Sequence, residues 1–227
     1  MYLIANFKAH QVDMGPYIRR LESLPKTEME IILSPPSLYL QMGANSRFST
    51  AAQDVSSYPE GPFTGETPAS VLKASGADFV LIGHSERRHL FNEDSPLLKK
   101  KFTNCVEAQL HPILCVGETL EEHTTGNYLE KIRKQIEDVY VASPFPPLFA
   151  YEPVWAIGSG KIPSMESIEE VVQLIRETVD GAKVLYGGSV NVENAKKIGA
   201  ITDGLLVGSA SKNVETFIQI IQQLETL

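Results

Sequence analysis

Residues 150–161 read AYEPVWAIGSGK. The stretch begins at the end of a short apolar run, passes through Glu152 and the rigid Pro153, and ends in a loop built on Gly-Ser-Gly. Trp155 and Ile157 lie in this loop, where large apolar side chains would be wasted unless they cover something. A carboxylate fixed at a strand end beneath a Gly-rich loop suits a proton transfer from which water is excluded. The stretch therefore predicts a buried strand with a site at its carboxyl end.

Eight short apolar runs of this kind are spread along the 227-residue chain. They are rich in Val, Ile, Leu, Phe or Ala and do not alternate strictly with polar residues, which is typical of strands buried on both faces. We expect strands at residues 2–8, 30–34, 48–54, 79–84, 112–117, 148–152, 183–187 and 204–208.

Helical patterns lie between the runs. Apolar residues recur at helical spacing over residues 128–140, 168–179 and 214–224, and each stripe predicts an amphipathic helix that packs on a sheet. Ser164 precedes the second stripe and Gly181 follows it, as helix caps do. Strand–helix alternation implies a parallel sheet with right-handed crossovers, which is either open and doubly wound or closed.

The number of runs favours closure. Eight strands fit a (β/α)8 barrel, and no Gly-x-Gly-x-x-Gly follows the first run, which weakens a dinucleotide-binding interpretation. The sequence shows no linker or composition shift. It therefore predicts an α/β fold in which eight parallel strands form a barrel surrounded by helices, in a single domain over residues 1–227.

Composition argues against several classes of protein. The formal net charge of −8 is unlike that of nucleic-acid-binding proteins, and it means that any anion site must be built locally from backbone N–H groups and a few cations. Cys105 and Cys115 match no metal-ligand spacing and are expected to be reduced thiols. No apolar run approaches the roughly 20 residues that span a bilayer, and the first residues do not resemble a signal peptide. We expect a cytoplasmic protein with no nucleic-acid or membrane partner.

Polar residues follow several of the predicted strands at the end where barrels carry their active sites. Glu152 is a candidate general base, although a solvated loop carboxylate is the alternative. His84 ends a predicted strand and precedes the start of a short helix, so a neutral imidazole is plausible there, and a packed core histidine is the alternative. Asn6 and Lys8 flank Phe7, and period-two alternation points both toward the same side, the barrel interior or its mouth.

Two Gly-rich turns end the last two strands, Gly187-Gly188-Ser189 and Gly208-Ser209. The loops after the seventh and eighth strands of barrels commonly bind phosphate through backbone N–H groups. A single turn of this kind is usually only a turn. Two in adjacent final strands indicate a phosphate site.

Taken together, these segments resemble the triosephosphate isomerase family, whose fold is the TIM barrel. The resemblance covers nearly the whole chain. It is carried by residues 4–8, 52–55, 63–67, 83–88, 115–118, 150–161, 186–190 and 203–208.

The resemblance implies the interconversion of dihydroxyacetone phosphate and D-glyceraldehyde 3-phosphate through an enediolate, without cofactor or metal. Glu152 would be the catalytic base, and His84 the neutral electrophile, a pairing that is a standard example of tuned acid–base chemistry. Asn6 and Lys8 would bind the substrate, with Lys8 stabilising the enediolate charge. The phosphate would be held by Gly158, Ser189, Gly208 and Ser209.

The resemblance also implies supporting groups, a lid and a partner. Glu86 and Cys115 match site-adjacent positions of the family, and residues 154–162 match its lid. Members are homodimers, in which the loop at about residues 55–64 reaches the partner, so that Thr64 would approach the partner copy's site. The chain departs from the usual pattern at positions that carry no catalytic group: Phe7, Ala9-His10, Ser159, Ile162-Pro163 and Ser209.

Two alternatives stay open at this point. Another phosphate-binding barrel, acting for example on a ribosyl phosphate, would share the Gly-rich turns but would not predict the whole segment 150–161. A non-catalytic binding protein on the same fold is the other alternative, since a fold does not establish an activity. Loss of Lys8, His84 or Glu152 would favour that second alternative, and all three are present.

Overall fold

The computed structural model describes residues 1–227, and its strands close into a barrel. Each strand pairs in parallel with the next, and β8 pairs with β1, so that Ile4 lies opposite Ile32 on one side and Leu206 on the other. The strands are β1 (Tyr2–Asn6), β2 (Glu30–Ser34), β3 (Ser49–Ala52), β4 (Phe79–Ile82), β5 (His111–Val116), β6 (Leu148–Tyr151), β7 (Lys183–Tyr186) and β8 (Gly204–Val207). The predicted (β/α)8 barrel is confirmed.

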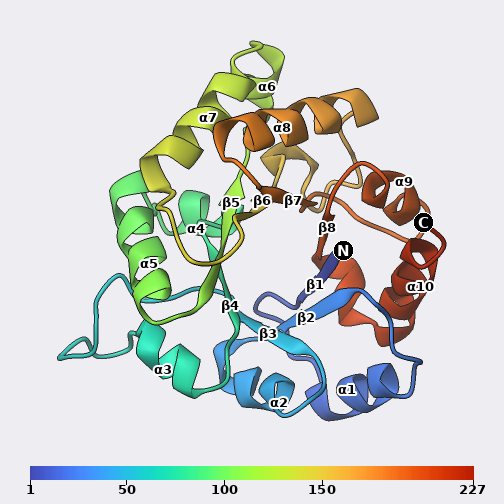
Figure 1. Cartoon of the computed structure of the whole chain (residues 1–227). Coiled ribbons are helices and arrows are strands. Elements are labelled where there is room, and N and C mark those ends of the chain that lie inside the picture. Colours follow the sequence, from blue (N-terminus) through green and yellow to red (C-terminus); the bar gives the residue numbers. More distant parts are fainter.

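Helices surround the strands on the outside of the barrel (Figure 1). The α-helices are α1 (Met14–Glu22), α2 (Leu40–Ala44), α3 (Ala69–Ala74), α4 (Ser85–Leu90), α5 (Ser95–Glu107), α6 (Leu120–Thr124), α7 (Tyr128–Val139), α8 (Met165–Thr178), α9 (Ala195–Gly199) and α10 (Val214–Leu224). Three short 3-10 helices are η1 (Ser37–Tyr39), η2 (Val154–Ala156) and η3 (Ser209–Lys212).

The helices begin and end for local reasons. Ser164 caps α8 by accepting a hydrogen bond from Ser167 N, and Asn213 caps α10 in the same way. The three predicted stripes become the buried faces of α7, α8 and α10, which confirms those helices. No helix combines the length and the apolar character that crossing a membrane requires.

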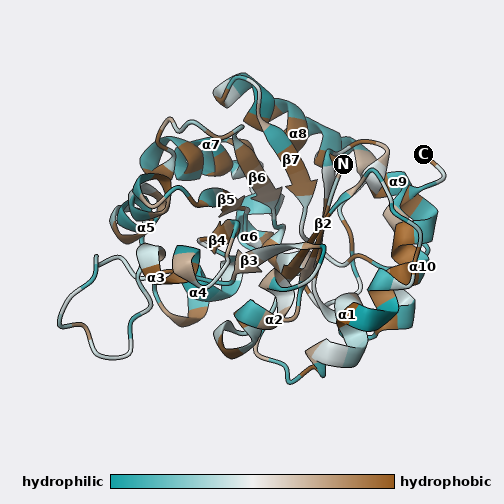
Figure 2. Cartoon of the chain, turned by 60° about the horizontal axis from the view of Figure 1, so that its bottom comes forward, coloured by the Kyte–Doolittle hydropathy of each residue, from teal (hydrophilic) through white to brown (hydrophobic).

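Alternation along the strands divides the core into two layers. One set of side chains fills the barrel, among them Ile4, Ala150 and Leu206, and the other set packs between strands and helices. Figure 2 shows the strands mostly in the apolar colour and the helices with both colours. Because side chains alternate along a strand, the next inward-facing position after Ile4 is Asn6, and the next after Ala150 is Glu152. The strand period therefore brings these two polar side chains to the carboxyl-end mouth of the barrel.

One loop projects from the body of the molecule between β3 and α3 (Figures 1 and 2). It is closed at its base by a hydrogen bond from Ser56 N to Thr67 O. Near its tip Tyr58 stacks on Phe63 with ring centroids 4.3 Å apart, and Tyr58 is 50% exposed. Phe63 is partly buried. A stacked aromatic pair with one half-exposed ring, on a protruding loop, is unusual for a surface that faces only water.

Candidate active site

A cavity of about 300 Å³ lies at the carboxyl ends of the strands. It brings together most of the residues singled out from the sequence, although they are far apart along the chain. Those that line it are Asn6, Lys8, His84, Gly158, Ser189, Gly208 and Ser209. The ammonium of Lys8, the imidazole of His84 and the glycine-rich backbone therefore lie together at the mouth of the barrel.

Lys8 is held in a constrained position. Its φ of 49° lies in the left-handed region, where a residue with a side chain is normally strained by 1–3 kcal/mol. Its backbone N–H donates to Asn6 Oδ1 at 3.0 Å, and its ammonium donates to Glu86 Oε1 at 2.6 Å. The carbonyl of Lys8 accepts a hydrogen bond from Gln53 Nε2. These contacts aim one fixed positive charge into the cavity.

Glu86 supplies the countercharge for Lys8. Burial alone would raise the pKa of Glu86, but the hydrogen bond from Lys8 and the surrounding basic groups outweigh it and lower the pKa. The carboxyl is therefore ionised at neutral pH. Its other oxygen lies 3.7 Å from His84 Nδ1.

His84 precedes α4 and caps it. Its Nδ1 accepts a hydrogen bond from Glu86 N at 3.3 Å, so that in the neutral ring the proton belongs on Nε2. Nε2 lies 3.3 Å from Glu152 Oε1. The imidazole is 7% exposed and therefore presents one N–H donor toward the cavity and the carboxylate.

Glu152 is nearly completely buried, with 1% of its surface exposed. Its Oε2 accepts a hydrogen bond from Ser85 N at 2.8 Å, whereas Oε1 is buried without a hydrogen-bond partner. The carboxylate lines a second, adjacent cavity rather than the one that holds Lys8 and His84. It must turn away from Ser85 to reach a molecule in the first cavity.

Glycines make this position of Glu152 possible. A Cβ on Gly117 would lie 1.8 Å from the carbonyl oxygen of Glu152, and a Cβ on Gly187 would lie 2.9 Å from its Cγ. A Cβ on Gly188 would lie 2.2 Å from the hydroxyl oxygen of Tyr186. The Gly-Gly turn after β7 is therefore required by packing as well as by any ligand.

The loop after Glu152 is connected to the turn after β7. Ser189 Oγ donates to Ala156 O at 2.5 Å and accepts from Gly160 N at 3.3 Å. Gly158 and Gly160 both adopt positive φ values, which only glycine adopts readily. Ser189 thus connects the loop over residues 154–162 to the Gly-rich turn after β7.

Two of the predicted supporting residues lie elsewhere. Cys115 is fully buried in β5 and lines the second cavity, and burial raises the pKa of its thiol. Thr64 is exposed in the protruding loop and does not reach the cavity of its own chain. No group of three or more His, Cys, Asp or Glu side chains is arranged to hold a metal ion.

Some contributors had only a weak signal in the sequence. Ser85 contributes a backbone N–H, which no side-chain pattern reveals. Gly160 and Ile157 also line the cavity, and the sequence had marked both within the Gly-rich loop without assigning either of them to the substrate. Asn191 lies just after the Gly-rich turn that follows β7 and also lines the cavity.

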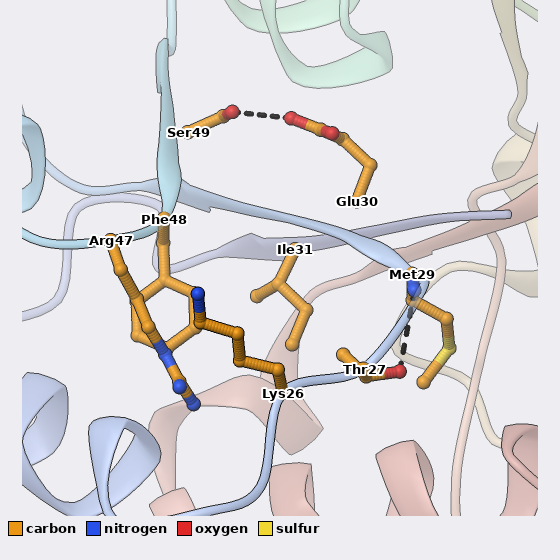
Figure 3. Close-up of a pocket in the computed structure, with 8 residues that line it drawn as sticks. All are labelled: Lys26, Thr27, Met29, Glu30, Ile31, Arg47, Phe48 and Ser49. Atoms are coloured by element: carbon orange, nitrogen blue, oxygen red, sulfur yellow. Dashed lines mark hydrogen bonds between the residues drawn. The ribbon is translucent and has the colours of Figure 1, made fainter.

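A separate cavity of about 260 Å³ lies where β2 and β3 begin, at the opposite end of these strands (Figure 3). Lys26, Arg47 and Phe48 line it, and Arg47 donates to the carbonyls of Leu21 and Leu24. None of the predicted site residues belongs to it.

Comparison with known proteins agrees with the geometry. A family model described as triosephosphate isomerase matches residues 1–224. A protein named triosephosphate isomerase from Neisseria meningitidis serogroup A is 40% identical over 223 residues, which covers 90% of this chain and 88% of that protein. One of the same name from Orientia tsutsugamushi (strain Boryong) is 38% identical over 213 residues, with 87% and 86% covered. Another, from Protochlamydia amoebophila, is 41% identical over 192 residues, with 78% and 73% covered.

Proposed function

The chain belongs to the triosephosphate isomerase family, and we propose that the cavity at the carboxyl ends of the strands is where it carries out the reaction of that family. The reaction is the interconversion of dihydroxyacetone phosphate and D-glyceraldehyde 3-phosphate, an aldose–ketose isomerisation of glycolysis and gluconeogenesis. The observation that carries the site assignment is the contact between Glu152 Oε1 and His84 Nε2, 3.3 Å apart and beside the ammonium of Lys8.

The proposed mechanism needs only groups of this chain. Glu152 removes a proton from C1 of dihydroxyacetone phosphate, which leaves an enediolate with its charge on O2. His84 gives its Nε2 proton to O2 and takes the proton of the O1 hydroxyl. Protonated Glu152, which holds the same proton or one exchanged with solvent, then delivers it to C2 to give the aldehyde. His84 donates from Nε2 to the substrate oxygens, and Lys8 stabilises the negative charge that develops on them. Asn6 completes the polar contacts at this end of the substrate.

The phosphate end is assigned to the Gly-rich turns. Gly158, Ser189, Gly208 and Ser209 border the same cavity. Close backbone approach is possible there because three of the five turn positions, 187, 188 and 208, lack a side chain. In a protein with a net charge of −8, such local N–H donors are what binds a dianion. No cofactor or metal is part of this proposal.

The loop over residues 154–162 is assigned as the lid. It already touches Ser189 on the far side of the cavity through Gly160. Closure over the substrate would draw Glu152 away from Ser85 and exclude water from an enediolate that can otherwise lose its phosphate. Glu86 and Cys115 support the site from outside the reacting groups.

The direct test is an assay of the purified protein with each triose phosphate. We expect conversion in both directions and no requirement for added metal or cofactor, including after treatment with a chelator. Catalytic turnover of a ribosyl phosphate in preference to the trioses would instead favour another phosphate-binding barrel.

We propose that the protein is a cytoplasmic homodimer and that residues 1–227 fold as one domain. The protruding loop supports the dimer, because it carries the stacked pair of Tyr58 and Phe63 and Tyr58 is 50% exposed. Thr64, which follows Phe63 in the chain, would then lie against the site of the partner copy, near the partner's Asn6 and His84.

Dilution tests the dimer. Because each site would borrow support from the partner copy, specific activity should fall as concentration drops through the dissociation constant of the dimer. The measurement pairs activity with mass photometry or sedimentation over the same concentrations. Full specific activity in a sample shown to be monomeric would contradict the proposed role of the loop.

A further inference from the structure

A cluster of aromatic and ionisable side chains surrounds the first turn of the proposed lid. Trp155 lies in η2, three residues after Glu152, and its Nε1 donates to Glu118 Oε1 at 2.9 Å. The backbone of the same turn is held as well, since Val154 N donates to Glu118 O at 3.0 Å. Glu118, in the loop after β5, therefore grips the start of the lid through both its side chain and its carbonyl.

Three polar side chains crowd around one carboxylate oxygen of Glu118. The carboxylate is completely buried, and its Oε1 faces Trp155 Nε1, Tyr151 Oη at 3.2 Å and His123 Nδ1 at 3.1 Å. Its Oε2 is buried without any partner. Burial raises the pKa of Glu118, and the hydrogen bond from Trp155 partly offsets the rise. A buried carboxylate in this state interacts strongly with any positive charge brought next to it.

His123 of α6 is the group that can supply this charge. Its ring lies 5.0 Å from that of Trp155 and 4.7 Å from that of Tyr128, and its side chain is 23% exposed, so protons can reach it from solvent. Histidine is the side chain that ordinarily changes charge between about pH 5 and 8. A charged ring would attract both the carboxylate of Glu118 and the face of Trp155.

The other ionisable groups around His123 do not replace it. The pKa of Tyr128 is raised to about 12, first by burial and then by its bond to Glu170 of α8, so this hydroxyl stays neutral. Burial likewise raises the pKa of Tyr151 in β6. On α6 itself, Glu122 is paired with Lys131 and its pKa is lowered, and Glu121 is the remaining carboxylate.

We propose that His123 is a positioning residue for the lid: its protonated ring fixes Trp155 and Glu118 in the arrangement seen here, so that the lid closes less readily at acidic than at alkaline pH. In this arrangement Glu152 is bonded to Ser85 and is outside the substrate cavity. Whatever strengthens the hold on Trp155 therefore opposes the movement that brings Glu152 to the substrate. The inference rests on the function proposed above, because the lid in question is the one over the triose phosphate.

Fluorescence tests the contact without any substrate. Trp155 is the sole tryptophan of the chain, so all tryptophan emission comes from the lid hinge. We expect the emission of the substrate-free protein to change with pH in a single transition. The titration should vanish in His123→Gln and persist in His89→Gln, the matched exchange at an exposed histidine of α4. A titration that persists in His123→Gln would overturn the proposal. If that titration were instead absent from Glu118→Gln, the titrating group would be Glu118.

Kinetics tests the consequence for closure. The substrate phosphate titrates alike for all variants, so the informative quantity is the KM of the wild type divided by that of His123→Gln. This ratio should rise about fivefold between pH 8 and pH 5.5, as expected for one cation–π contact and one charge-assisted hydrogen bond. A constant ratio would contradict the proposal.

A fixed positive charge separates positioning from mere packing. His123→Arg should show the high KM at every pH, whereas His123→Gln should show the low KM at every pH, with kcat changing less than KM in both. A purely structural role would move both variants in the same direction, and that result would overturn the inference. If every variant and the wild type lacked isomerase activity, the proposed function would fail, while the fluorescence titration would still decide whether His123 acts on Trp155.

Discussion

Replacing Glu152 by Gln is expected to lower kcat by about three to four orders of magnitude, because it removes the general base. Glu152 is the carboxylate that lies next to Nε2 of His84, the ring nitrogen that faces the substrate cavity. The amide oxygen of Gln can still accept the hydrogen bond from Ser85 N, so the side chain keeps its present position. KM should therefore change far less than kcat. The measurement is steady-state kinetics in both directions, with circular dichroism to verify the fold.

Stability gives this variant a second, independent readout. Glu152 buries a charge whose Oε1 has no hydrogen-bond partner, and such a group costs folding free energy. Removing the charge should leave the melting temperature unchanged or raise it, as is common where function and stability compete. Loss of activity together with retained or increased stability would distinguish loss of the base from unfolding.

Two further variants set the scale for Glu152→Gln. Glu152→Asp retains the acid but withdraws it by one methylene, and a misplacement of about 1 Å costs roughly 100-fold. Glu169→Gln makes the same charge change on the exposed face of α8 and should leave kcat within a factor of two. Near-normal turnover in Glu152→Gln would remove Glu152 as the base and with it the proposed mechanism.

The fold was largely predictable because its signal is local. A strand buried on both faces must be apolar over its whole length, so eight such runs could be counted, and each observed strand lies within two residues of a predicted one at either end. The prediction ran past the end of β1 because Phe7 is also buried, although it follows the strand. The short helices α2 and α9 gave no comparable signal, since five residues contain little more than one turn.

The site was predictable in composition but not in arrangement. Alternation along β1 and β6 is enough to place Asn6 and Glu152 at the mouth. That Glu152 rests on the backbone N–H of Ser85, 67 positions away, is a tertiary contact to which no sequence motif corresponds. The positive φ of Lys8 has the same origin, since contacts from Asn6, Gln53 and Glu86 impose it against the preference of the residue.

A buried ion cluster behind the site is the clearest feature that the sequence did not reveal. Lys101 of α5 is 4% exposed, and its ammonium bonds Asp54 Oδ1 at 2.7 Å and Glu93 Oε1 at 2.5 Å. Arg87 of α4 bonds both carboxylates as well, at 2.9 Å and 2.6 Å. A lysine on an amphipathic helix ordinarily lies at the surface, but Lys101 shares the buried face of Leu98, Phe102 and Cys105.

The cluster connects the elements that carry the site. Asp54 follows Gln53, which bonds the carbonyls of both Lys8 and Ser34. Arg87 follows Glu86, the partner of Lys8. Through these neighbours the cluster fixes the loop after β3 against α4 and α5, so that its loss would loosen the positions of Lys8 and His84 together.

Replacing Lys101 by Met is therefore expected to lower the free energy of unfolding by about 3–5 kcal/mol, the cost of leaving buried carboxylates without their partner. Glu93 Oε2 is already without a hydrogen bond, so the cluster has no spare donor to compensate. The matched control is Lys100→Met on the exposed side of the same helix, which should stay within about 0.5 kcal/mol of the wild type. Urea denaturation at neutral pH measures both.

The pH dependence of this loss has a definite sign. Burial already raises the pKa of Asp54 despite the nearby Lys101 and Arg87, and removing Lys101 raises it further. The folded variant then binds more protons than the unfolded chain, in which an aspartate titrates near pH 3.9, so its stability falls as pH rises above that value. The deficit should be largest near pH 7.5 and should shrink toward pH 5.

The double variant Lys101→Met/Glu93→Gln distinguishes the cost of unpaired buried charge from the cost of lost packing. If the cost arises from unpaired buried charge, neutralising Glu93 should recover a substantial part of the lost stability, because Arg87 alone can then serve Asp54. If the cost arises from the fit of the lysine side chain, the second substitution should add to the loss. A deficit that is independent of pH and is not relieved in the double variant would show that the electrostatic account of the cluster is wrong.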